Sequence, residues 1–236
     1  MKRVIMAAVL AAFAWAPAPA ALGAEADARL VANQDYPPAF PRAGARLVLD
    51  NPWGAAWDVV YPPGQPTPMH RHGLDSIGVE LADSSVTVTT PDGAAQSFPS
   101  RRGESYYMPR GTTHIEVTPA GFAPRHAVII ELKDGVPAAP APGPDLAAPA
   151  AQKVAESPRV ILWNYAWPAS PGAAVRLAHN AFIVVIDGGR LTDAGPDGTR
   201  RTQAVTSGQV LFRPAGAVLS EVAAEGPVRA VVAELK

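Results

Sequence analysis

The chain has 236 residues, of which 48% are hydrophobic, 17% are charged, 26 are proline and none is cysteine. The absence of cysteine excludes disulfide frameworks, thiolate metal sites and thiol nucleophiles, so a metal site would have to use histidine, carboxylate or backbone ligands. The low charge and dispersed apolar residues exclude a disordered chain, and a formal net charge of −1 provides no basic surface for nucleic acid.

The first 24 residues have the pattern of a bacterial export signal. Lys2 and Arg3 precede an uncharged apolar stretch at 4–15, and Ala-Leu-Gly-Ala at 21–24 provides the small residues of a cleavage site. The apolar stretch is too short, and too soon broken by proline, for a membrane anchor. We expect 1–24 to be a cleaved signal peptide, and the mature protein to be periplasmic or secreted, with no membrane partner.

A segment rich in proline and alanine at 135–152 divides the rest of the chain. Its five prolines exclude a helix or a central strand, so we expect an extended linker between a domain at 27–134 and a second domain at 153–236. The two domains repeat each other at an offset of 105 positions, which indicates a tandem duplication. The matching positions include Gly103, Pro109 and Gly111 in the first repeat and Gly208, Pro214 and Gly216 in the second.

Each repeat is predicted to be all-β. Runs of β-branched and aromatic residues at 85–90, 127–132 and 181–186 are separated from their neighbours by turn signals such as Pro-Asp-Gly, which occurs in both repeats. No window has an apolar period of 3.6 residues over three turns. Many short strands at even spacing predict a sandwich or barrel in each repeat.

Three of the five histidines form a candidate metal site. His70 and His72 are two positions apart, so in an extended strand their side chains point to the same face. His114 would join them from another strand. Three imidazoles make half of an octahedral ligand shell or three quarters of a tetrahedral one.

The segment around His114 resembles the second motif of the cupin family, which has the form G-x5-P-x-G-x2-H-x3-N. Gly103, Pro109, Gly111 and His114 match it, and Thr118 stands in place of the asparagine. The resemblance covers both repeats and implies a bicupin, two tandem jelly-roll β-barrels. It also implies that the three histidines are metal ligands.

The first cupin motif, G-x5-H-x-H-x3,4-E-x6-G, is matched only in part. Gly64, His70 and His72 fit it, but the position of the glutamate holds Ser76, or Asp75 if the shorter spacing applies. The final glycine is also missing. The carboxylate ligand that the family pattern contains is therefore not assigned.

The second repeat serves as an internal comparison for these positions. Its residues there are mostly apolar, so the fold does not require histidine, and we expect a metal site in the first barrel and a degenerate second barrel. On the next strand the first repeat has smaller or polar residues, which predicts a partly polar cavity in the first barrel. The pairs are His70 with Val175 (or with Arg176 if the loop gap lies elsewhere), His72 with Leu177, His114 with Leu219, Ser76 with Ala181, Gly78 with Ile183 and Glu80 with Val185.

Further residues are candidates for the surroundings of the site. Asp75 and Glu80 are candidates for a metal ligand or for a residue behind the ligands, although Asp75 is short and of the wrong parity. Ser76, Tyr106 and Tyr107 are candidates for the lining of a pocket, because one of two consecutive tyrosines in a strand must face inward. The sequence assigns no catalytic residue.

Three neutral imidazoles without a certain carboxylate favour one ion of Fe, Cu, Ni or Zn over Mg or Ca, and the missing glutamate weakens the case for Mn. The resemblance to three-histidine cupins implies a dioxygenase-like reaction on a small organic molecule, and a Lewis-acid isomerase is an alternative. A non-catalytic periplasmic protein that binds a small molecule or a metal is a further reading, as is a vestigial site in an assembly protein. Cupin sheets also permit a homodimer.

Overall fold

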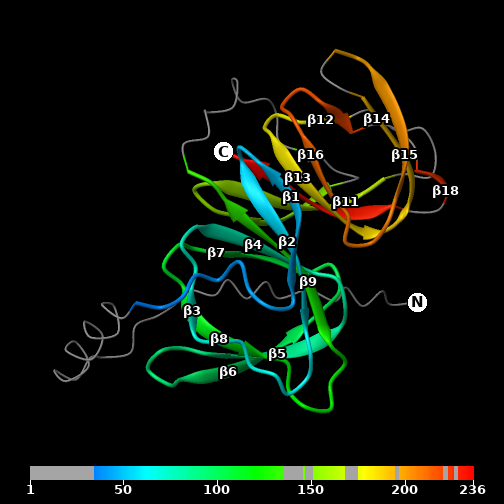
Figure 1. The fold of residues 1–236 in the computed structure, drawn as a ribbon. Coiled ribbons are helices and arrows are strands. Elements are labelled where there is room, and N and C mark those ends of the chain that lie inside the picture. The colour runs from blue at the N-terminus through cyan, green and yellow to red at the C-terminus, as the bar shows by residue number, and fades with distance from the viewer. Residues whose placement is uncertain are drawn as a thin grey trace, which may run out of the picture. The chain divides into compact units, whose positions relative to one another are not determined.

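The computed structural model describes residues 35–134, 146, 151–167, 175–194, 197–219, 223–225 and 228–236. The expected signal peptide and nearly all of the expected linker lie outside these residues. The chain from Tyr36 to Lys236 belongs to one compact unit, in which the described residues form β-strands (Figure 1). The described residues contain no helix with the length and hydropathy of a membrane span.

The first domain consists of two antiparallel sheets. The five-stranded sheet has the spatial order β1 (Ala45–Asn51), β2 (Gly54–Tyr61), β9 (Arg125–Leu132), β4 (Asp75–Glu80) and β7 (Ser105–Met108). The four-stranded sheet has the order β3 (His70–Arg71), β8 (Thr113–Val117), β5 (Ser84–Thr89) and β6 (Ala95–Ser100). Non-consecutive neighbours in both sheets show that the chain crosses repeatedly between them.

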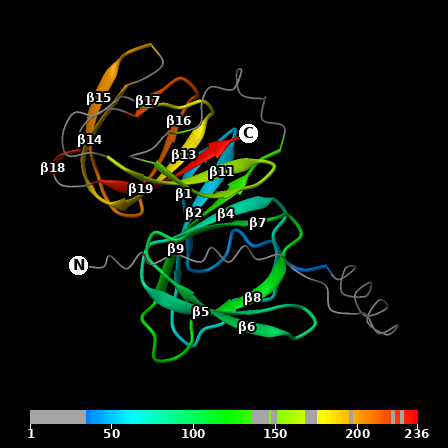
Figure 2. The ribbon, with the colours of Figure 1, turned by 180° about the vertical axis from the view of Figure 1, so that it is seen from behind.

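The second domain (Figure 2) repeats this strand order and adds one strand, β18, which agrees with the predicted duplication. One sheet has the order β10 (Ala151–Glu156), β11 (Val160–Ala166), β19 (Arg229–Leu235), β13 (Ala181–Asp187) and β16 (Val210–Arg213). The other has the order β12 (Val175–Arg176), β17 (Val218–Leu219), β14 (Gly189–Ala194) and β15 (Arg200–Val205), and β18 (Ala223–Glu225) pairs with β14.

The repeated Pro-Asp-Gly signals form the turns of equivalent hairpins. Gly93 joins β5 to β6 with a φ of 85°, and Gly198 joins β14 to β15 with a φ of 82°. Both values lie in the left-handed region, where a residue with a Cβ is strained and glycine is not. The same turn chemistry therefore fixes the register of the same hairpin in each domain.

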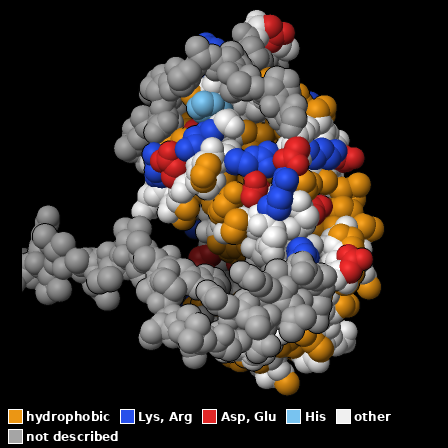
Figure 3. Space-filling view, turned by 90° about the vertical axis from the view of Figure 1, so that its left-hand side faces the viewer, with side chains coloured by type: hydrophobic (Ala, Val, Ile, Leu, Met, Phe, Trp, Pro, Cys, Tyr) orange, Lys and Arg blue, Asp and Glu red, His pale blue; other side chains and the backbone are white. Residues whose placement is uncertain are grey.

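The central strands β4, β9, β13 and β19 of the five-stranded sheets are buried on both faces, which explains their apolar runs. Along β13, Ile183 and Val185 point into the interior of the second domain, whereas Phe182 and Val184 join a cluster that contains residues of both domains. Polar positions on the inner face of a five-stranded sheet are therefore exceptions. On the face drawn in Figure 3, by contrast, basic and acidic side chains lie intermingled among hydrophobic ones.

Candidate metal site

The fold brings the three predicted histidines together. His70 on β3 and His114 on β8 are paired in register, and the backbone nitrogen of His72 donates a hydrogen bond of 2.8 Å to the carbonyl oxygen of Thr112. All three side chains are buried, and one ligand nitrogen from each lies within 4.8 Å of the other two. Among the described residues, these three side chains are the group that could hold a metal ion together.

The nitrogen atoms of this cluster fit a metal ion. Nδ1 of His70 donates to the carbonyl oxygen of Pro68 at 2.9 Å, and its Nε2 is buried without a hydrogen-bond partner among the described residues. Nε2 of His72 lies 3.4 Å from Nε2 of His114. Metal–imidazole bonds of about 2.0–2.1 Å place neighbouring ligand nitrogens at such a separation. A carbonyl that fixes the tautomer of a ligand histidine is typical of metal sites.

Burial keeps the imidazoles neutral. Desolvation lowers the pKa of His70 to about 4 and that of His72 to about 3, and the histidines repel one another when charged. Burial also lowers the pKa of His114. Neutral imidazoles retain the lone pairs that a metal ion requires, so the site is prepared for a cation at neutral pH.

A buried ion cluster lies in the same interior, centred on Arg125 at the start of β9. Its Nη2 donates to Oε1 of Glu80 at 2.7 Å and to the hydroxyl of Tyr106 at 2.6 Å, and its Nη1 donates to Oε1 of Glu116 at 2.9 Å. The Ser100 hydroxyl donates to the other oxygen of Glu80 at 2.7 Å. Arg125 is only 1% exposed, so these bonds replace its hydration.

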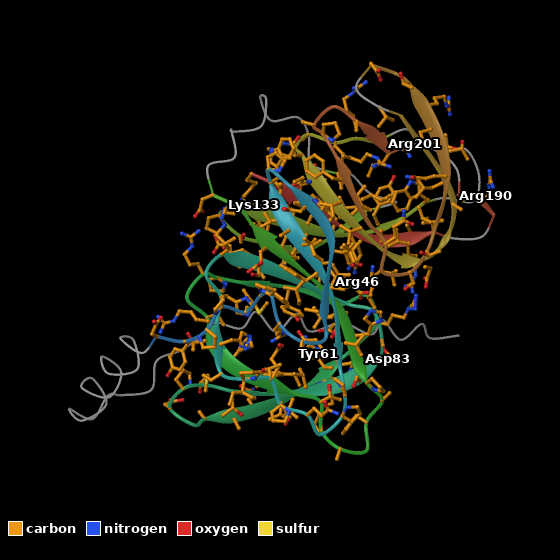
Figure 4. All side chains as sticks on the ribbon, in the orientation of Figure 1. Arg46, Tyr61, Asp83, Lys133, Arg190 and Arg201 are labelled. Atoms are coloured by element: carbon orange, nitrogen blue, oxygen red, sulfur yellow. The ribbon has the colours of Figure 1, made fainter. Side chains whose placement is uncertain are left out.

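Arg42 completes the ion cluster. Its Nη2 donates to the hydroxyl of Tyr61 at 2.7 Å and lies 3.5 Å from Oε2 of Glu116. Tyr61, labelled in Figure 4, also lies under the guanidinium of Arg125, 4.5 Å from the ring centroid. Burial raises the pKa of Glu116, but the charge of Arg125 outweighs it, and the pKa falls well below its usual range. The cluster thus pairs two arginines with two glutamates.

Sequence reasoning did not find the arginines. The signal existed in the last strand of each repeat, where a two-residue gap changes the offset from 105 to 103 positions. There His126-Ala-Val aligns with Arg229-Ala-Val, so Arg125 aligns with Val228. The structure supports this alignment, because the two residues occupy equivalent places. Arg125 is paired with Tyr61 at the end of β2, and the carbonyl oxygen of Val228 accepts a hydrogen bond of 2.9 Å from the backbone nitrogen of Trp167, just after β11. A charged residue opposite an apolar counterpart is the same signal that singled out the histidines.

Asp75 does not join the three histidines, and its assignment as a candidate ligand is corrected. Its Oδ1 accepts a hydrogen bond of 2.9 Å from the backbone nitrogen of Arg110, and its Oδ2 accepts one of 2.9 Å from Arg159. Asp75 has the opposite parity to Ser76, which points inward and places its hydroxyl 3.3 Å from Nδ1 of His72. Because the side chains of β4 alternate, the Asp75 carboxylate faces away from the histidines and the Ser76 hydroxyl faces them.

The two consecutive tyrosines face opposite sides of β7. Tyr106 reaches into the interior, whereas Tyr107 packs against the apolar cluster that contains residues of both domains. A Cβ added to Gly78 would lie 2.1 Å from Cζ of Tyr106. The space over Gly78, which Ile183 occupies in the second domain, is therefore filled by the Tyr106 ring, and the expected cavity does not lie there.

The second domain has the same backbone geometry without the histidines. Val175 and Leu219 are paired in register as His70 and His114 are, and the backbone nitrogen of Leu177 donates a 2.8 Å hydrogen bond as that of His72 does. Leu177 and Leu219 are buried in an apolar core. The fold therefore does not require imidazole at these positions.

No protein-family model matches the chain. The β-alanine degradation protein BauB of Pseudomonas aeruginosa is 31% identical over 74 residues, which cover 31% of this chain and 77% of that protein. A cupin domain of Bordetella pertussis is 30% identical over 40% of this chain and 98% of its own, with a TM-score of 0.36. A mutant oxalate decarboxylase of Bacillus subtilis has a TM-score of 0.55 and is 12% identical, over 86% of this chain and 75% of its own. At that identity the likeness concerns the fold alone.

Proposed function

Since this chain belongs to the cupin superfamily as a member with two β-domains, we propose that its first domain binds one transition-metal ion through His70, His72 and His114 and acts on a small organic molecule. The observation that carries the proposal is the contrast between the two domains. Three imidazoles converge in the first, and the same register positions are apolar in the second. Three neutral nitrogen ligands favour Fe, Cu, Ni or Zn, with Mn disfavoured by the lack of a carboxylate.

A dioxygenase-like reaction is the activity that we favour. A bound ion would supply Lewis acidity and open coordination positions for small ligands. Burial would keep the imidazoles neutral, and Pro68 behind His70 and Ser76 beside His72 would orient them. Arg125 would hold Glu116, two residues from His114, in one position.

Oxygen uptake by the metal-loaded protein tests the reaction. The substrate panel includes β-alanine, because the name of the Pseudomonas relative concerns its degradation. We expect uptake that His114→Ala abolishes, with Leu219→Ala in the second domain as the matched control. Metal binding without uptake for any substrate would favour the alternative, a non-catalytic protein that binds a small molecule or a metal.

The location and assembly of the protein are part of the proposal. The residues at 1–24 favour export and cleavage, and cupin sheets favour a homodimer with a small molecule as the other partner. Mass spectrometry of the protein recovered from a periplasmic extract would give the processed mass, and light scattering would give the number of chains. An intact mass would contradict cleavage.

A further inference from the structure

Glu131 on β9 is an inward-facing carboxylate that the proposed function leaves without a role. Its Oε2 accepts a hydrogen bond of 2.9 Å from Nε1 of Trp57 on β2. On β9 it has the parity of Arg125 and Ile129, which face the interior of the first domain, whereas Ile130 faces the cluster containing residues of both domains. Glu131 therefore lies on the inner wall of the first domain.

The register of the sheet places Glu131 near the histidines. It is paired with Ser76 of β4, and paired residues of antiparallel strands have Cβ atoms about 4.5–5.5 Å apart. The Ser76 hydroxyl in turn lies 3.3 Å from Nδ1 of His72. Ser76 occupies the motif position at which the family pattern has its glutamate. Glu131 is thus a carboxylate on the neighbouring strand, at the same level of the barrel.

Glu131 differs from the other inward carboxylates because it has no arginine partner. Glu80 and Glu116 are both bound to Arg125. Among the described residues, Trp57 is the hydrogen-bond donor of Glu131, and none forms an ion pair with it. The half-buried side chain therefore has one tethered oxygen, Oε2, and one oxygen, Oε1, that remains available.

The surroundings of Glu131 suit a group that exchanges protons. Burial raises its pKa, and the hydrogen bond from Trp57 opposes this only in part. Its partners across the sheet, Ala55 and Ser76, carry no charge. The charged and titratable groups that face this wall are the three histidines, Arg42 and, further along β8, Glu116. A carboxylate with a raised pKa is a stronger base than an ordinary one.

A comparison with the second domain shows which features of Glu131 belong to the fold and which are found only in the first domain. Nε1 of Trp163 donates to Oε2 of Glu234 at 3.0 Å, so the tryptophan–glutamate bond belongs to the fold. Glu234, however, is 0% exposed, and its Oε1 is buried without a hydrogen-bond partner among the described residues. The accessible carboxylate beside histidines is therefore a feature of the first domain.

We propose that Glu131 is a proton acceptor of this site and that the molecule it recognises carries an acidic hydroxyl, as a phenol or an enol does; this rests on the proposed function. When the molecule binds beside the three histidines, its O–H bond breaks. The proton passes to Oε1 of Glu131, and the electron pair stays on the oxygen of the molecule. Trp57 holds the other carboxylate oxygen in place during the transfer.

Binding of 4-nitrocatechol to the full-length protein loaded with Zn(II) tests this role. Zn(II) is a d¹⁰ ion and adds no visible absorbance of its own, so the spectrum reports whether the bound probe has lost its proton. Glu131→Gln keeps an acceptor for Trp57 and removes the base. We expect it to weaken binding at pH 7 about tenfold, the equivalent of one pKa unit, and to move ionisation of the bound probe to higher pH. Glu234→Gln should bind as the wild type does.

The outcomes distinguish this inference from the proposed function. Glu131→Gln with Zn(II) bound, and with the affinity and pH profile of the wild type, would overturn the role of Glu131 while the metal site stands. A wild-type protein that holds Zn(II) but does not bind the probe would overturn it as well. A wild-type protein that does not hold Zn(II) would remove the proposed function, and the inference with it.

Discussion

The two domains have the same strand order and opposite interiors. In the second, the inner face is an apolar core apart from the buried Glu234, whereas the first contains three imidazoles and a buried ion cluster. The backbone hydrogen bonds at the equivalent positions are the same. The positions compared are His72 with Leu177, His114 with Leu219, Glu80 with Val185, Arg125 with Val228 and Tyr61 with Trp167.

The barrel fold therefore does not require the polar interior that the first domain has. Buried charges cost free energy unless they are paired and hydrogen-bonded, and apolar residues of similar volume often stabilise a protein as well or better. The second domain is the apolar solution to the same packing problem. We therefore attribute the polar groups of the first domain to the proposed site, and their pairing offsets the cost of burying them.

The largest expected effect comes from Arg125→Met. The substitution leaves Glu80 and Glu116 buried without their main partner, and breaking a buried ion pair in this way costs about 3–5 kcal/mol of the free energy of unfolding. Denaturant-induced unfolding, followed by tryptophan fluorescence, measures this loss. The double variant Arg125→Val with Glu80→Val introduces the pair found in the second domain, and we expect it to lose less stability than Arg125→Met. A larger loss in the double variant would contradict the comparison.

The next effect concerns Gly78. An alanine there would place its Cβ on the Tyr106 ring, and overpacking of this kind costs about 1–3 kcal/mol. Adding Tyr106→Leu, which copies Leu211 of the second domain, should recover part of the loss because the ring is gone. Thermal unfolding of the single and double variants measures both. Equal stability of Gly78→Ala and wild type would show that Tyr106 does not occupy this space.

A pH-dependent effect separates the domains in the metal-free protein. The folded-state pKa values of His70, about 4, and His72, about 3, lie below the ordinary value of 6.5. The unfolded chain therefore binds more protons, and stability is lost as the pH falls from about 6.5 to about 3, the lower of the two folded-state pKa values. Replacing both residues with those of the second domain, His70→Val and His72→Leu, should flatten this part of the profile. An unchanged profile would argue that the histidines are not buried and neutral.

The smallest effect is expected for Asp75→Asn. Its ion pair with Arg159 is partly exposed, and such pairs contribute at most about 1 kcal/mol. Metal content should not change, because the carboxylate faces away from the histidines. Parallel measurement of stability and bound metal checks both statements, and a loss of metal would restore Asp75 as a ligand.

The sequence was sufficient for the duplication, the all-β class and the three histidines, because each left a local pattern or a contrast between the repeats. It did not show that Arg125 joins Glu80 to Glu116, since that contact depends on how three strands meet across the barrel. Gly78 predicted an open space, but the neighbouring strand fills it with Tyr106. A side chain from a neighbouring strand can thus fill the space over a glycine, and the sequence of one strand alone does not show this.

We infer that the first domain holds a metal ion at the three histidines, and that the second domain has apolar residues at the same positions and holds none. Elemental analysis of the purified protein, beside a variant carrying His70→Val, His72→Leu and His114→Leu, tests it most directly. We expect one transition-metal ion per wild-type chain. We expect none in the variant, which should stay folded because it has the side chains of the second domain. A folded wild-type protein that takes up no metal, or a variant that retains it, would show that the three histidines do not form a metal site.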